Sequence, residues 1–213
     1  MAFIGSKSKL AIKLSQLKGF EQQKVKAEQY PTDPEIAAQV LWNAYLLGDL
    51  EGKVSVDLGC GTGILGIGAL YLGNSKVYFV DSDKEALDIA KINVSRVKSE
   101  SSDIGEAVFL CQDMAKFNKK VDLVLQNAPF GTKVRHADRE FLKKAVKLAD
   151  TIYSFHKSET KGFVEAFAKD SGFEISHCWD FRFPLKQAMS FHRRKIHRIN
   201  VSCFRLIKAK LFK

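Results

Sequence analysis

Short apolar runs rich in β-branched residues alternate with longer amphipathic segments along most of this chain. The runs are typical of strands that are buried on both faces, and the segments between them have helical periodicity. Such alternation produces a parallel sheet with helices on both faces. Strands are predicted at 54–57, 77–81, 107–111, 121–126, 151–156, 174–182 and 199–208. We therefore predict an α/β fold with a mostly parallel seven-stranded sheet.

The predicted helices begin and end at recognisable signals. Residues 1–18 place leucines on one face and lysines around it, and Gly19 follows as a stop. A second helix is predicted from Glu35 to Leu47, with Asp33 as its cap and Pro34 in its first turn. Further helices are predicted at 64–72, 83–97, 137–150 and 159–171. With 213 residues and no low-complexity linker, we expect one domain over residues 1–213.

A glycine-rich turn follows the first predicted strand of the sheet. It reads Asp57-Leu58-Gly59-Cys60-Gly61-Thr62-Gly63 and leads into an apolar helix. Glycines let the backbone turn tightly and approach a ligand closely, and a helix N-terminus beside them completes a nucleotide-binding unit. The spacing is neither the dinucleotide fingerprint nor the phosphate loop. Asp57 would repel phosphate and suits a cationic ligand, although a tight turn without a ligand remains the alternative.

Two further strand ends carry side chains with matching chemistry. Asp81 ends the second strand at the spacing where an acid binds ribose hydroxyls, and Ser82 follows it. Asp113 and Met114 follow the third strand, where they would contact an adenine ring, and Asp113 could equally cap the next turn. The fourth strand ends in Asn127-Ala128-Pro129-Phe130.

The Asn127 motif is the catalytic hypothesis. The Asn127 side-chain oxygen and the Ala128 carbonyl can each accept one N–H of an exocyclic amine, which localises the lone pair of its nitrogen. Pro129 restricts Ala128 to extended geometry, and Phe130 offers a face on which a base can stack. The alternative is an ordinary Asn-x-Pro turn.

The two ends of the chain are basic and the middle is mildly acidic. The whole chain has a formal charge of +10. The stretch 181–213 contains basic residues and no Asp or Glu, which favours a polyanionic substrate. The four cysteines form no metal-ligand or disulfide pattern, so we predict no metal site and a reducing, cytoplasmic environment. No apolar run approaches the span of a membrane helix.

The ordered motifs resemble class I S-adenosylmethionine-dependent methyltransferases of the amino-methylating branch. They resemble more narrowly the small methyltransferases whose eukaryotic member makes N6-methyladenosine in small-subunit ribosomal RNA. The quoted motifs continue with Glu28-Gln29-Tyr30-Pro31-Thr32, Tyr153-Ser154-x-His156-Lys157-Ser158 and Phe191-His192-x-x-Lys195, so the resemblance runs nearly end to end. It implies a Rossmann-like fold and S-adenosyl-L-methionine as cofactor.

The resemblance also implies site residues and partners. Residues 1–48 would form a helical segment over the cofactor site, and 181–213 a basic strand and loop region that contacts RNA. A small zinc-binding activator protein is implied as a partner. The implied cofactor contacts are Gln29, Thr32, Asp57, Gly59, Cys60, Gly61, Asp81, Ser82, Asp113, Met114 and Asn127. The expected substrate contacts are His156, Lys157, His192, Arg193, Arg194 and Lys195.

The chain departs from the family pattern at Ala128, where the pattern has proline. A backbone carbonyl survives this change, so the chemistry remains available. Two other functions therefore stay open. One is methylation of a protein glutamine side chain, and the other is a non-catalytic RNA-binding module that has kept a nucleotide-binding fold.

Overall fold

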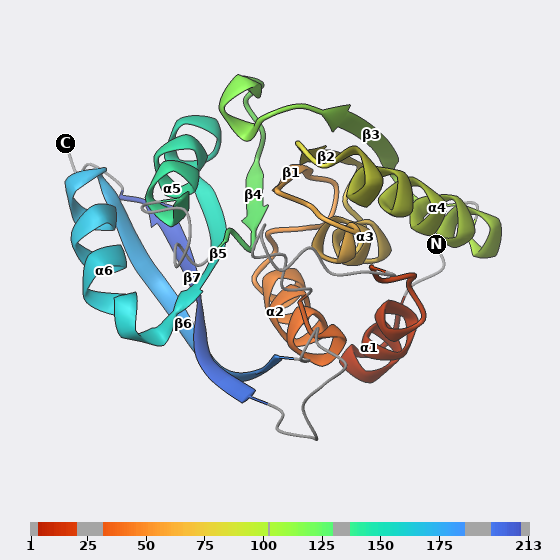
Figure 1. Ribbon diagram of the computed structural model, residues 1–213, viewed down its shortest axis with the longest axis horizontal. Helices are drawn as coiled ribbons and strands as arrows, with labels where there is room; N and C mark the ends of the chain where they lie inside the picture. Colours follow the sequence, from red (N-terminus) through yellow and green to blue (C-terminus); the bar gives the residue numbers. More distant parts are fainter. Residues whose placement is uncertain (1–3, 21–31, 102, 130–136, 186–196, 210–213) are drawn as a thin grey trace, which may run out of the picture.

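The computed structural model describes residues 4–20, 32–101, 103–129, 137–185 and 197–209 (Figure 1). The helices are α1 (Lys7–Ser15), α2 (Pro34–Leu46), α3 (Ile64–Tyr71), α4 (Lys84–Glu100), α5 (Ala137–Leu148) and α6 (Lys161–Asp170), with short 3₁₀ turns η2 (Met114–Lys116) and η3 (Ser158–Thr160). The strands are β1 (Val54–Leu58), β2 (Lys76–Asp81), β3 (Glu106–Cys111), β4 (Leu123–Gln126), β5 (Thr151–Lys157), β6 (Phe173–Leu185) and β7 (His197–Lys208).

The seven strands form one sheet in the order β3-β2-β1-β4-β5-β7-β6. The first five are parallel, while β7 is antiparallel to both β5 and β6. The predicted fold class is confirmed, and the last two strands are longer than their sequence patterns indicated. In this order β1 and β4 are central, and the chain turns from one half of the sheet to the other between them. Ligands bind at such a switch point, beyond the carboxyl ends of the strands.

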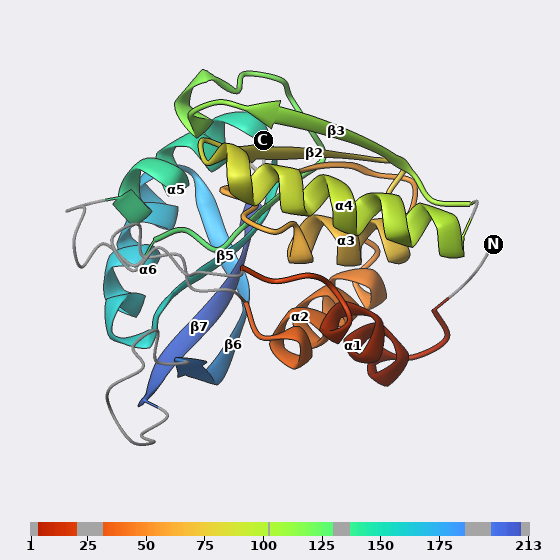
Figure 2. The ribbon, with the colours of Figure 1, turned by 45° about the vertical axis from the view of Figure 1, so that its right-hand side comes forward.

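Helices cover both faces of the sheet, as Figures 1 and 2 show. One core lies between the sheet and α1 to α4, and it contains Leu41, Ile67 and Phe155. The other lies between the sheet and α5 and α6, and it contains Leu142 and Phe204. Because side chains alternate along a strand, neighbouring residues of β4 and β5 enter opposite cores.

The predicted start of α2 agrees with the structure, whereas the predicted ends of α1 do not. Asp33 caps α2 by accepting from the backbone N–H groups of Glu35 and Ile36, as predicted, and Pro34 is its first residue. The prediction of a helix over residues 1–18 was wrong at both described ends, since α1 begins after the Ser6 cap and ends before Gln16. Ser6 accepts from the backbone N–H of Lys9, and this cap was not recognised.

Close packing explains why α3 contains glycines. A Cβ atom on Gly68 would lie 2.3 Å from Leu41 Cδ1, and one on Gly66 would lie 2.5 Å from Phe79 Cε1. The helix therefore lies close to both α2 and β2. Among the described residues, no helix is long and apolar enough to cross a membrane.

Candidate active site

The glycine-rich turn joins β1 to α3 at the carboxyl end of the sheet. Gly59, Gly61 and Gly63 have φ angles of +66°, +53° and +88°, which L side chains rarely adopt. A Cβ atom on Gly59 would also lie 3.0 Å from Phe141 Cε1 of α5. The turn is therefore a backbone surface that tolerates side chains poorly, as a ligand cradle requires.

Asp57 lies buried beneath this turn. Its Oδ2 accepts a hydrogen bond of 2.8 Å from the backbone N–H of Gly66 in α3. Burial, with a smaller contribution from the Asp81 charge, raises the pKa of Asp57 to about 7. The backbone hydrogen bond opposes that shift. A cation placed nearby would stabilise the carboxylate, so this end of the site is suited to a positively charged ligand.

Asp81, at the end of β2, holds the other side of the turn. Its Oδ2 accepts from the Gly61 backbone N–H at 2.8 Å, and its Oδ1 accepts from that of Asp83 at 2.8 Å. Each carboxylate oxygen keeps a further lone pair, so ribose hydroxyls can still donate to them. Ser82 is exposed beside it, and Cys60 is buried in the turn. Burial raises the pKa of the Cys60 thiol, which excludes a thiolate there at neutral pH.

Asp113 follows β3 and precedes η2. Its side chain accepts from the Ala115 backbone N–H at 2.8 Å and caps η2, as the alternative interpretation predicted. Asp113 is nevertheless exposed, and Met114 beside it is half-buried. Contact with an adenine ring therefore stays a prediction for both residues.

The predicted catalytic motif follows β4 directly. Asn127 Nδ2 donates to Thr32 Oγ1 at 2.9 Å, and this bond connects the motif to the segment before α2. Within the described part of the chain, Asn127 Oδ1 is buried without a hydrogen-bond partner. Ala128 is buried and Pro129 is half-buried. Because Thr32 fixes the amide nitrogen, the amide oxygen is left as a free acceptor.

A buried polar chain lies next to Asn127 and was not recognised as such from the sequence. Gln126 Nε2 donates to Ser154 Oγ at 2.8 Å, and Ser154 Oγ lies 2.6 Å from His156 Nε2. His156 was predicted to contact substrate, yet only 1% of its surface is exposed. Lys157, the next residue, is partly exposed and its Nζ lies 3.6 Å from Glu159 Oε1.

Asn93 of α4 was also missed. Its Nδ2 donates to the backbone carbonyls of Lys18 and Thr62, each at 3.0 Å, and its Oδ1 accepts from the Lys18 backbone N–H at 2.7 Å. One buried amide therefore connects the segment after α1 to the glycine-rich turn. Its only sequence signal was an asparagine on the apolar face of a helix.

Several predicted residues lie outside the described part of the chain. They are Gln29, Phe130, His192, Arg193, Arg194 and Lys195.

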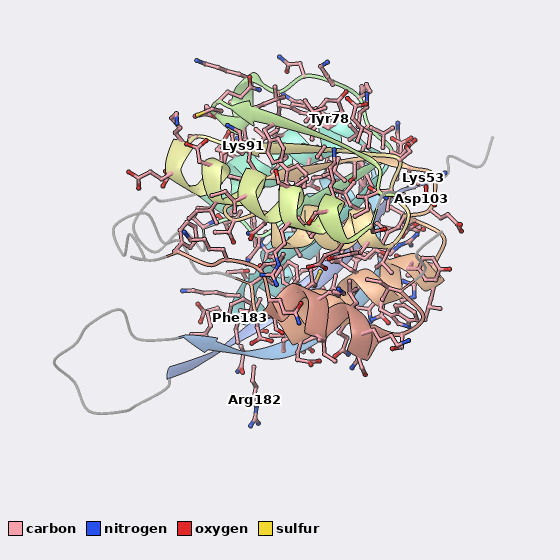
Figure 3. The ribbon with its side chains drawn as sticks, turned by 90° about the vertical axis from the view of Figure 1, so that its right-hand side faces the viewer. Lys53, Tyr78, Lys91, Asp103, Arg182 and Phe183 are labelled. Carbon is pink, nitrogen blue, oxygen red and sulfur yellow. The ribbon has the colours of Figure 1, made fainter. Side chains whose placement is uncertain are left out.

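The described part of the basic C-terminal stretch divides into two kinds of arginine. Arg205 is paired with Asp49 through two hydrogen bonds of 2.7 and 2.9 Å, and both side chains are nearly buried. Arg182 on β6 is exposed, and Figure 3 shows it pointing away from the body of the protein while Phe183 points inward. Arg205 therefore has a structural role, and Arg182 is available to a polyanion.

Known methyltransferases are similar to this chain over most of its length. The rRNA N(6)-adenosine-methyltransferase METTL5 of Danio rerio is 35% identical over 90% of this chain and 94% of its own length. The chain belongs to the METTL5 family. The Drosophila melanogaster Mettl5 is 36% identical over 92% of this chain and 94% of its own length. The profile for ribosomal protein L11 methyltransferase (PrmA) matches residues 40–178.

The METTL5 match and the PrmA match differ in extent. The ribosomal protein L11 methyltransferase of Psychrobacter arcticus is 34% identical, over 57% of this chain and 42% of its own length. The METTL5 relatives of Danio rerio and Drosophila melanogaster, in contrast, match at least 90% of this chain. The PrmA match thus reflects the shared methyltransferase core.

Solved structures agree with this assignment. A protein of Pyrococcus horikoshii, described as a candidate RNA methyltransferase, is 42% identical over 96% of this chain and 98% of its own, with a TM-score of 0.86. Magnesium protoporphyrin IX methyltransferase of Synechocystis with bound S-adenosylmethionine is 17% identical over 93% of this chain and 90% of its own. Its TM-score is 0.62, and the likeness shows the fold. This METTL5-family protein is an S-adenosylmethionine-dependent methyltransferase.

The residues present fit that cofactor. The positive-φ turn leaves room for close backbone approach, and Asp57 is a buried carboxyl group whose ionisation a cation favours. S-adenosylmethionine carries a sulfonium and an amine, and both are cationic. Asp57 and the Gly59 and Gly61 backbone would hold this end, and Asp81 the ribose.

Proposed function

We propose that this protein transfers a methyl group from S-adenosylmethionine to the N6 amine of an adenosine in ribosomal RNA. The observation that carries the proposal is the buried, unpartnered Asn127 Oδ1, whose amide nitrogen is held by Thr32. Relatives that cover most of the chain are named rRNA N(6)-adenosine-methyltransferases, which supports this acceptor.

The chain's own residues bind and orient the acceptor amine. When bound, S-adenosylmethionine supplies an electrophilic methyl group. Asn127 Oδ1 accepts one N–H of the amine, and the Ala128 carbonyl accepts the other. These two bonds draw the nitrogen toward tetrahedral geometry, with its lone pair directed away from both acceptors. Ala128 is buried beside Pro129, so the substitution of proline by alanine leaves the carbonyl in a confined position.

The finer site assignments remain part of the proposal. Gln29, Thr32, Asp57, Gly59, Cys60, Gly61, Asp81, Ser82, Asp113 and Met114 are proposed to hold the cofactor. Lys157 and the basic residues His192 to Lys195 are proposed to contact RNA, together with the exposed Arg182. A small zinc-binding activator protein is proposed from the family resemblance, and a cytoplasmic location from the scattered cysteines.

The test is methyl transfer from labelled S-adenosylmethionine to small-subunit ribosomal RNA, with digestion of the RNA to nucleosides and their separation. We expect label in N6-methyladenosine. Ribosomal proteins are assayed in parallel, because the PrmA match makes them the natural competing acceptor. Label confined to the protein fraction would refute the RNA assignment and would favour the protein-methylating alternative. Absence of label in every fraction, with cofactor binding intact, would favour a non-catalytic RNA-binding module.

A further inference from the structure

A chain of polar side chains is buried at the carboxyl ends of β4 and β5. Gln126, Ser154 and His156 are each at most 1% exposed. Hydrogen bonds of 2.8 and 2.6 Å connect them in that order. They lie on the face of the sheet that carries Val124 and Ile152 and is covered by α5 and α6. This face is mostly apolar, although Ser202 of β7, which pairs with His156, is a further buried polar residue on it. Three polar side chains therefore occupy positions that apolar ones fill elsewhere.

This arrangement costs stability. Among the described residues, three side-chain nitrogen or oxygen atoms are buried without a hydrogen-bond partner, namely Gln126 Oε1, Asn127 Oδ1 and His156 Nδ1. Leaving such an atom unpaired costs about 1–3 kcal/mol. All three atoms belong to the catalytic motif or to the chain beside it. A cost concentrated at one site calls for a functional explanation.

Burial makes His156 a weak base. Burial lowers its pKa to about 4, against a small opposing effect of the Asp138 charge, so the ring is neutral at pH 7. Because Gln126 Nε2 donates to Ser154 Oγ, the serine hydroxyl can donate its own proton to His156 Nε2. The ring proton then lies on Nδ1. The three side chains thus form a hydrogen-bonded frame.

The position of Gln126 shows what this frame holds. Gln126 is the last residue of β4, where it pairs with Leu58 of β1 and Ser154 of β5. The next residue is Asn127, whose own side chain is held by Thr32. The point where the backbone leaves the sheet is therefore fixed twice, by the Gln126 side chain and by the Asn127 side chain.

We propose that Gln126, Ser154 and His156 are positioning residues for methyl transfer, which aim Asn127 Oδ1 and the Ala128 carbonyl at the acceptor amine. The proposal rests on the proposed function. A misplacement of about 1 Å near reacting groups can cost on the order of 100-fold in rate. The chain acts through Asn127, so its loss affects the transition state more than the binding of either ligand.

The test compares Gln126→Met and Ser154→Ala with the wild type in single-turnover methylation of ribosomal RNA. We expect each variant to lower the rate of the chemical step about tenfold or more. The affinity for S-adenosylmethionine and the KM for RNA are expected to stay within about twofold. The melting temperature of Gln126→Met should be unchanged or higher, because an apolar side chain replaces one with an unpaired buried atom.

Two further variants separate positioning from general stability. In the double variant, the two rate losses should not add, because both break the same chain. His156→Gln should retain most activity, since its amide can reach Ser154 as the ring nitrogen does. Ser55→Ala is the matched control: Ser55 is a buried serine bonded to Asn74 at the other end of the sheet, and we expect its loss to affect stability alone.

The outcomes are distinguishable. Unlabelled RNA with the wild-type protein would refute the proposed function and this inference with it. Labelled RNA with wild-type rates in both single variants would overturn the inference alone. Additive losses, or losses that match a decrease in the folded fraction, would also overturn it.

Discussion

The two halves of the active site satisfy their buried polar groups differently. On the cofactor side, the carboxylates of Asp57 and Asp81 accept hydrogen bonds from backbone N–H groups of the glycine-rich turn and the helices beside it. On the acceptor side, Gln126, Asn127 and His156 each leave one buried atom unpaired by any described residue. The proposed cofactor half is held by its own hydrogen bonds, while the acceptor half keeps Asn127 Oδ1 as an acceptor for a substrate.

The free-energy cost of burying polar groups therefore differs in kind between the two halves. In the cofactor half the cost is electrostatic, because burial disfavours the Asp57 carboxylate more than its hydrogen bond from Gly66 favours it. In the acceptor half the cost is unpaired hydrogen-bonding capacity. Substitution of Asp57 should therefore change how stability and cofactor affinity depend on pH. Substitutions around Asn127 should change the rate of methyl transfer.

The largest expected effect is that of Asn127→Ala on methyl transfer. It removes the free acceptor Oδ1, and the loss of one preorganised hydrogen-bonding group at a transition state costs about 10²–10³ in kcat. Single-turnover kinetics with saturating cofactor measure this loss, and cofactor binding is expected to survive. Asn118→Ala is the matched control, since Asn118 is exposed after η2 and lies outside the proposed RNA contacts. Equal rates in the two variants would remove Asn127 from the mechanism.

The next effect is the pH dependence that Asp57 imposes. Its pKa is about 7 in the folded protein and near 3.8 when unfolded. The folded state therefore holds a proton between these values that the unfolded state has lost, and stability decreases as pH rises from about 4 to 7. The difference corresponds to about 4 kcal/mol. Urea unfolding of wild type and Asp57→Asn at several pH values measures it.

Asp57→Asn should weaken this decrease, because an amide keeps the Gly66 hydrogen bond without a charge. The cofactor should act in the opposite direction. A bound cation favours the carboxylate, so S-adenosylmethionine affinity should rise between pH 6 and pH 8 in the wild type and stay flat in the variant. A wild-type affinity that does not change with pH would place the cation away from Asp57.

A smaller effect is expected on the free energy of unfolding when either of two positive-φ glycines is replaced by alanine. Gly59 has a φ of +66°, and its Cβ would contact Phe141 at 3.0 Å. Gly48 has a φ of +76°, and a Cβ there would meet nothing within 4 Å. Gly48→Ala should cost about 1–2 kcal/mol from backbone strain alone. Gly59→Ala should cost more and also weaken cofactor binding, as urea unfolding and calorimetry can measure. Equal stability costs and equal affinities would show that the turn is not crowded.

Sequence patterns anticipated the placement of the proposed cofactor residues more completely than that of the residues around Asn127. Asp57, the glycines and Asp81 stand next to strands and in a fixed order, so local sequence indicates their shared position. The chain of Gln126, Ser154 and His156 depends on the register between β4 and β5, which no local pattern reveals. His156 was accordingly predicted to contact substrate, and it is buried.

The fold shows the same division between local and long-range information. Seven strands were predicted from apolar runs, and all seven formed. The pairing of Arg205 with Asp49 was not predicted, because the two residues are far apart in the sequence and meet only when β7 lies beside β5. A count of basic residues in 181–213 therefore overstated the charge available to RNA.

The smallest expected effect tests that charge directly. Arg182 is exposed on β6, so Arg182→Gln should weaken RNA binding and lower the slope of log affinity against log salt by about 0.7–0.9. Arg205→Gln should leave the slope unchanged and instead destabilise the fold by up to about 3–5 kcal/mol, because it removes the positive charge that pairs with Asp49 and leaves that carboxylate with the Tyr153 hydroxyl. Filter binding over a salt series and urea unfolding measure the two quantities. If the slope decreased in Arg205→Gln, or stayed unchanged in Arg182→Gln, the RNA would bind a different surface from the one that contains Arg182.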